Sequence, residues 1–291
     1  MGLCRKELLV TKGQLARWKG SVQIFVALGM EIILLIEYLW GCTDFGIRYG
    51  TKITPCVLVF LFQSGTIGVN LPKVMIYLGF VVLLSDVPFM DEATPYVMAR
   101  SKRGAWWRGE CIYIWMASFF YMAFITLVSI LIVLPTVTWN GLWGSTIVKA
   151  IKGSSMTLGF VLDPQIVQVF YPSATLWLTF LAGWLSMSLL GHMAYAINLL
   201  INKKVAGIAV MVFFILLDPI IGWLGIGSAN HWMHPLSPVS WSSMEYWKLV
   251  SSQAPLETGY VFRMYGVLIV LCVIVIAIAA RRKQIEVDAL Q

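Results

Sequence analysis

Residues 112–134 read IYIWMASFFYMAFITLVSILIVL, and this stretch is the clearest indication of the fold class. It contains no Asp, Glu, Lys or Arg. A helix needs about 20 predominantly apolar residues to cross the hydrocarbon core of a bilayer, and this stretch is long enough to do so. It therefore predicts a membrane-spanning helix.

Other stretches of the chain have the same character, at residues 21–40, 175–200, 205–226 and 259–280. Tryptophans lie near several of the boundaries, as is typical of helix ends at a lipid interface. Of the 291 residues, 59% are hydrophobic and only 12% are charged, against about 25% charged residues in soluble domains. The mean hydropathy of +0.81 agrees. The composition excludes a water-soluble protein and predicts an all-α integral membrane protein.

Residues 53–87 can be interpreted as one span or two. Polar residues and glycines between positions 63 and 68 weaken the first half, and Pro72 with Lys73 interrupts the run. One span would extend from Lys73 to about Asp86. Residues 54–63 would then lie at the outer interface or dip into the bilayer and return, which requires protein to cover their backbone.

The distribution of basic residues favours one span, because cytoplasmic loops carry an excess of Lys and Arg. With one span, fourteen of the 21 basic residues fall on the side of the N-terminus: Arg5, Lys6, Lys12, Arg17, Lys19, Arg100, Lys102, Arg103, Arg108, Lys203, Lys204, Arg281, Arg282 and Lys283. We therefore predict six spans in the cell membrane, with both termini in the cytoplasm. Replacements of Trp143 and Trp241 should then be accessible from outside the cell, and one of Ser101 should not.

Several classes of function find no support in the sequence. The net charge of +7 is explained by membrane topology, so no nucleic-acid partner is expected. Five cysteines without CxxC spacing indicate neither a disulfide framework nor a zinc site. The chain contains no phosphate-binding loop and no HExxH motif. No internal repeat or linker is visible, so residues 1–291 are treated as a single membrane domain without an enzymatic activity of its own.

The segment before residue 104 reads SDVPFMDEATPYVMARSKR from Ser85 to Arg103. Acidic residues at its start and basic residues at its end complement a helix dipole, and Gly104 is a plausible helix stop. A short helix between two spans and a solvated, positively charged turn are both compatible with this spacing. The first twenty residues are similarly open to two interpretations, a helix on the membrane surface or a basic tether.

This segment, followed by Trp-Trp-Arg-Gly at 106–109, resembles small bacterial ABC transporter permeases of the type 2 (type V) exporter class. The resemblance implies a six-span subunit that pairs with a second permease subunit, as a homodimer or heterodimer in membrane lipid. It also implies an N-terminal elbow helix and two copies of a separate ATPase, which hold ATP and Mg. The chain itself would need no cofactor.

In that family the loop between the second and third spans is a coupling helix that docks on the ATPase. The resemblance assigns this contact to Asp91, Glu92, Thr94, Tyr96, Val97, Arg100 and Arg103. The cargo would be a peptide or a lipophilic compound, and the residues do not distinguish export from import. The long outer segment 136–172 and the apolar segment 54–63 depart from the family pattern.

Ionisable residues inside the predicted spans are the other candidates, since such groups usually face the interior of a bundle or water. Glu31 either lines a substrate or proton path or forms an interhelical hydrogen bond. Asp218 precedes Pro219, which favours a structural kink over a substrate site. His192 is interpreted as a hydrogen-bonded interior histidine. Glu31 or Asp218 would be the proton carrier in the alternative function, a secondary proton-coupled transporter.

Overall fold

The computed structural model describes residues 3–63, 71–85, 102–152, 162–201, 203–224 and 228–282. Within these ranges all regular secondary structure is helical, and five helices are long and apolar enough to cross a membrane. They are α2 (Val22–Tyr49), α6 (Arg103–Val133), α9 (Pro172–Ile201), α10 (Lys204–Leu224) and α11 (Thr258–Arg282). These helices confirm the five apolar stretches, as expected of a multi-pass membrane protein.

The helix boundaries follow local chemistry more than hydropathy. The Ser21 hydroxyl accepts a hydrogen bond from the Ile24 amide and caps the start of α2. Gly50, with a φ of 62°, ends the helix in the left-handed conformation. The helix continues nine residues past the predicted end at Trp40, and an Asp44–Arg48 ion pair at i, i+4 supports this last part.

Helix α4 (Leu71–Leu83) occupies the ambiguous second span, and it is shorter than a full crossing. Its 13 residues measure about 20 Å at 1.5 Å per residue, against a hydrocarbon core of about 30 Å. Pro72 lies in the first turn, where its missing N–H leaves no intrahelical bond unmade. Residues 51–63, which follow α2, contain the single helical turn α3 (Leu58–Leu61).

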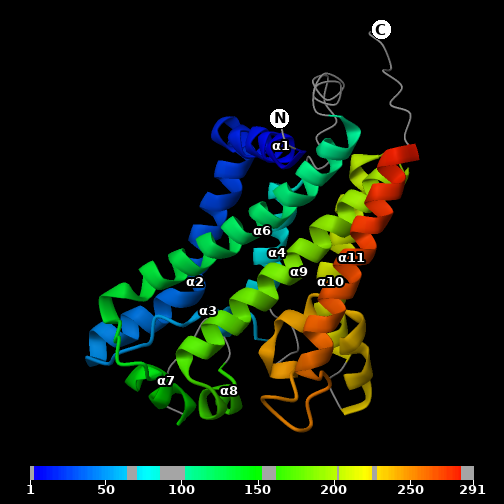
Figure 1. Ribbon diagram of the computed structural model, residues 1–291. Helices are drawn as coiled ribbons and strands as arrows, with labels where there is room; N and C mark the ends of the chain where they lie inside the picture. Colours follow the sequence, from blue (N-terminus) through cyan, green and yellow to red (C-terminus); the bar gives the residue numbers. More distant parts are fainter. Residues whose placement is uncertain are drawn as a thin grey trace.

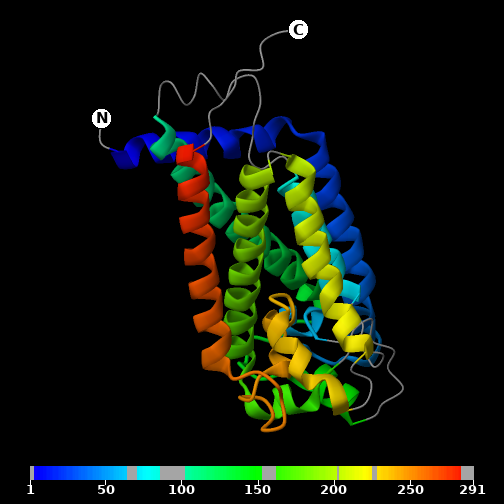
Figure 2. The same ribbon diagram turned by 90° about the vertical axis from the view of Figure 1, so that its right-hand side faces the viewer.

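The long helices form one bundle in which α9 packs against α6, α10 and α11 (Figure 1). Helix α1 (Leu3–Arg17) lies across one end of the bundle, where the last turns of α11 are also found (Figure 2). We call this the α1 end. The short helices α7 (Gly144–Ile151) and α8 (Pro164–Val169) lie at the other end, which we call the α7 end.

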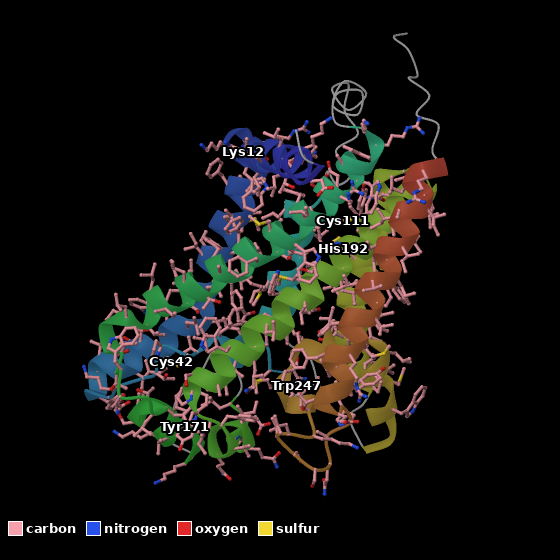
Figure 3. The ribbon with its side chains drawn as sticks, viewed as in Figure 1. Lys12, Cys42, Cys111, Tyr171, His192 and Trp247 are labelled. Atoms are coloured by element: carbon pink, nitrogen blue, oxygen red, sulfur yellow. The ribbon has the colours of Figure 1, made fainter. Side chains whose placement is uncertain are left out.

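Two segments of mostly irregular backbone are largely buried in the half of the bundle nearer the α7 end, and their exposed residues are Lys52, Lys248, Leu249, Ser252 and Gln253. Segment 51–63 follows α2, and segment 237–256 follows the 3-10 helix η3 (Ser228–Leu236) and contains η4 (Ser240–Ser242) and η5 (Met244–Tyr246). Val57, Leu58 and Phe62 are at most 1% exposed, and Trp247 is fully buried beside α11 (Figure 3). The condition that protein covers residues 54–63 is therefore met.

The expectation that Trp143 and Trp241 are accessible is wrong for both side chains, which are 7% and 2% exposed. Trp143 packs on Phe60 and donates to the Phe170 carbonyl at 2.9 Å. Trp241 donates to the carbonyls of His234 and Pro235. Both rings are covered by other parts of the chain, which hydropathy alone does not indicate.

Candidate functional site

A buried ion pair joins α4 to α10. The Lys73 ammonium lies 2.7 Å from a carboxylate oxygen of Asp218, and the two side chains are 0% and 3% exposed. Lys73 also donates to the Ser243 hydroxyl at 2.7 Å, and the Ser240 hydroxyl donates to the second Asp218 oxygen at 2.7 Å. We call Lys73, Asp218, Ser240 and Ser243 the polar cluster.

The polar cluster draws together parts of the chain that are distant in sequence. Ser240 and Ser243 lie one turn apart at η4, so both hydroxyls reach the ion pair. Ser243 in turn donates to the Phe62 carbonyl at 2.7 Å, which links segment 237–256 to segment 51–63. The cluster therefore connects two helices and both buried segments.

Aromatic side chains enclose the polar cluster on the side of α11. Tyr265 donates from its hydroxyl to the Pro238 carbonyl at 2.8 Å, and Ser186 of α9 donates to the same carbonyl at 3.1 Å. The Trp241 ring packs on Tyr265 with centroids 5.2 Å apart. Because the surroundings exclude water, loss of either charge would leave the other buried without compensation, which typically costs about 3–5 kcal/mol.

Sequence reasoning placed Asp218 correctly inside a span but did not find its partner. Lys73 was interpreted as a residue at the end of a span, and the two serines were not singled out. The signal that could have found the pair is that Asp218 is the one charged residue of the span candidate 205–226 and Lys73 is the one basic residue of the span candidate 73–86. Intramembrane charges usually pair with one another.

Glu31 lies where α2, α4 and α6 meet. Its side chain is buried, and a Cβ at Gly79 of α4 would collide with both the Glu31 carboxyl and the Tyr121 hydroxyl. Glu31 and Tyr121 are hydrogen-bonded to each other, and the Tyr121 hydroxyl donates to the Ile76 carbonyl at 2.8 Å. The Tyr121 hydroxyl of α6 is therefore linked to both α2 and α4.

The second carboxyl oxygen of Glu31 has no hydrogen-bond partner among the described residues. Glu31 therefore combines the interhelical hydrogen bond with a spare polar atom, and both interpretations from the sequence stay open. Glu37, six residues further along α2, is exposed on the outer face of the same helix.

His192 is an interior histidine of α9, as the sequence indicated (Figure 3). Its Nδ1 lies 2.7 Å from the Ser188 carbonyl, one turn back on the same helix. The ring packs on Trp115 of α6 with centroids 6.0 Å apart. These partners differ from those of Glu31 and Asp218, so the three predicted residues do not form one site.

Most of the predicted ATPase contact lies outside the described residues: Asp91, Glu92, Thr94, Tyr96, Val97 and Arg100. Arg103 is described, and it is the exposed first residue of α6. The prediction that Gly104 ends a helix is wrong, because Gly104 is the second residue of α6. The helix extends nine residues before the predicted start at 112, beyond the part that hydropathy marks as a span.

The extended start of α6 is held against α1 by polar contacts. Arg108 pairs with Glu7 at 2.5 Å, and Thr11 donates to the Gly109 carbonyl at 2.9 Å. The Gln14 amide donates to Glu110, which is fully buried, at 2.6 Å. Residues 3–17 are therefore a helix docked on α6 and not a simple basic tether.

Comparisons with protein families, with curated proteins and with solved structures found no match for this chain. The functional interpretation therefore depends on the geometry above and on the resemblance of residues 85–109.

Proposed function

We propose that this chain is the membrane-spanning subunit of an ATP-driven ABC exporter that moves a peptide or a lipophilic compound across the cytoplasmic membrane. Two such subunits, identical or related, would work with two copies of a separate ATPase. In this proposal α2, α4, α6, α9, α10 and α11 are the six crossings, with segment 51–63 completing the crossing of α4. The α1 end faces the cytoplasm and the α7 end faces outside.

The observation that carries the proposal is the position of α1. It lies across the end of the bundle, as an elbow helix on a membrane surface would, and it is fixed to the first turns of α6 (Figure 2). The segment that resembles a coupling helix leads directly into those turns. A push on this segment would therefore reach α1 and α6 together.

The charges support the same orientation. Basic residues of α1, of the start of α6 and of the end of α11 lie at the α1 end, whereas Arg48, Lys52, Lys149 and Lys248 belong to segments at the other end. The larger basic group marks the cytoplasmic side of a membrane protein. A basic surface also suits contact with a soluble partner on that side.

The proposal is tested by purifying the tagged chain from cells that also produce its proposed partner subunits. An ATPase subunit should be recovered with it, and the chain purified alone should not hydrolyse ATP above background. Sustained hydrolysis by the lone chain would contradict the proposal, as would quantitative recovery without any nucleotide-binding subunit under mild detergent.

The coupling segment gives a sharper prediction. Tyr96→Ala and Arg100→Ala should reduce recovery of the ATPase at least about threefold, because aromatic and arginine side chains dominate binding energy at interfaces. Lys102→Ala, at the exposed edge of the same segment, should leave recovery within error of the parent. Unchanged recovery for both Tyr96→Ala and Arg100→Ala would mean that 91–103 is a solvated turn.

A second candidate, a proton-coupled secondary transporter, is favoured by one observation: Glu31 is a buried carboxyl group with one oxygen that has no hydrogen-bond partner among the described residues. In this case Glu31→Gln, which cannot release a proton, should abolish transport driven by a proton gradient. Glu37→Gln, on the exposed face of α2, should leave that transport unchanged. Under the exporter proposal, Glu31→Gln keeps a donor for Tyr121 and retains most activity. A protonophore that stops transport while ATP remains high would favour the second candidate.

A further inference from the structure

The two buried segments fill the bundle near the α7 end. Neither is a continuous helix, yet Phe62 and Trp247 on them are almost completely enclosed. Non-helical backbone is tolerated at membrane depth only where protein covers it or where it lines a water-filled cavity. Segments 51–63 and 237–256 thus close this end of the bundle by packing against each other and against the helices.

The polar cluster determines how this closure is attached. Ser243 is bonded to Lys73 of α4 and to the Phe62 carbonyl, whereas Ser240 is bonded to Asp218 of α10. The turn at η4 therefore bridges the two helices at their ion pair. If α4 and α10 moved apart, the turn would lose its bonds to one of them, and the closure would come loose.

The use of charges at this place has a physical consequence. An apolar plug resists opening because its surface becomes exposed to water. A buried ion pair has the opposite property, since both charges lose hydration on burial and regain it when water enters. The pair holds the closed arrangement while leaving an open, hydrated arrangement within reach.

We propose that Lys73 and Asp218 form a charge lock, which keeps the α7 end closed and separates when that end opens. The lock depends on the proposed function only for its orientation, with the α7 end facing outside the cell. It adds a specific function to a pair that would otherwise be a static brace between α4 and α10.

The lock is tested with a reporter inside the closure. Ser242→Cys places a thiol at a fully buried position of η4, in a chain whose five natural cysteines are replaced by serine. A membrane-impermeant maleimide is added to intact cells, and the rate of labelling is measured. Asp218→Asn removes the partner charge of Lys73, and labelling should become at least about tenfold faster than in the reporter alone.

A matched control is available on the surface. Asp44→Asn breaks the exposed ion pair with Arg48, 2.8 Å in length, and should leave the labelling rate unchanged. Exchange of the two charges, Lys73→Asp with Asp218→Lys, should return labelling to within about threefold of the reporter alone, because the attraction is restored.

The lock is contradicted if folded Asp218→Asn protein, eluting as a single species in detergent, is labelled at the rate of the reporter alone. It is also contradicted if the protein with the exchanged pair is labelled as fast as Asp218→Asn. If neither variant folds, the labelling rate of the Ser242→Cys reporter alone tests the closure. A rate equal to that of the exposed Trp139→Cys would show that no closure exists. A Trp139→Cys protein that is not labelled from outside would instead contradict the proposed orientation.

Discussion

Among single residues, Gly79 is closely surrounded by side chains of α2 and α6. Its missing side chain is what allows the Glu31 carboxyl and the Tyr121 hydroxyl to meet against α4. A helix interior would otherwise favour alanine over glycine by about 0.5–1 kcal/mol. The glycine is therefore explained by the contact it admits and not by backbone conformation.

We predict that Gly79→Ala destabilises the folded protein by about 1–3 kcal/mol, because the methyl group must displace a hydrogen-bonded pair in a packed interior. Gly29→Ala on α2 is the matched control, since nothing lies within 4 Å of its ideal Cβ position. Thermal unfolding in detergent should show a lower midpoint for Gly79→Ala and an equal or higher one for Gly29→Ala. Equal midpoints for both variants would show that the Glu31 contact can move aside at no cost.

At the scale of elements, the junction of α1 with α6 depends on close approach at Gly109. A Cβ at this residue would lie 2.7 Å from the Val10 Cβ and 3.0 Å from the Glu7 carbonyl oxygen. The hydrogen bond from Thr11 to the Gly109 carbonyl needs the same proximity. Backbones can approach this closely only where one side chain is absent, as is common between helices in membranes.

Gly109→Ala should therefore move α1 away from α6 and expose the N-terminal helix to protease, with cleavage faster by about fivefold or more, as expected when local unfolding becomes easier. Gly104→Ala, five residues earlier on α6, meets only the flexible Arg108 side chain at 3.6 Å and should behave like the parent. Limited proteolysis followed by mass spectrometry of the N-terminal fragments measures the difference. If α1 is cleaved equally slowly in both variants, the junction tolerates separation.

For the molecule as a unit, the proposed six-crossing arrangement predicts which cysteines an impermeant reagent reaches. Trp139→Cys and Trp232→Cys replace side chains that are 72% and 65% exposed, and both should be labelled in intact cells. Lys102→Cys, exposed next to the α1 end, should be labelled only after the membrane is permeabilised. The buried Trp241→Cys should be unreactive on both occasions. Labelling of Lys102→Cys in intact cells would contradict the arrangement.

The five long helices could be predicted from the sequence, because length and hydropathy are local properties that the bilayer selects directly. It also indicated that residues 54–63 need protein cover and that Glu31 and Asp218 are not ordinary surface carboxylates. The ends of the helices were less well predicted. Both α2 and α6 continue into polar sequence, where capping residues and contacts with other helices determine the residue at which the helix ends. Hydropathy carries no information on such contacts.

Which polar groups contact each other could be read only from the folded chain. Lys73 and Ser243 are separated by 170 positions, and Glu110 and Gln14 by 96, so no local pattern relates them. A charge in an apolar stretch must find a partner, but its own neighbours do not say which one, since that depends on how the helices pack. The same packing buried the Trp143 ring against Phe60 of segment 51–63 and the Trp241 ring of segment 237–256 against Tyr265.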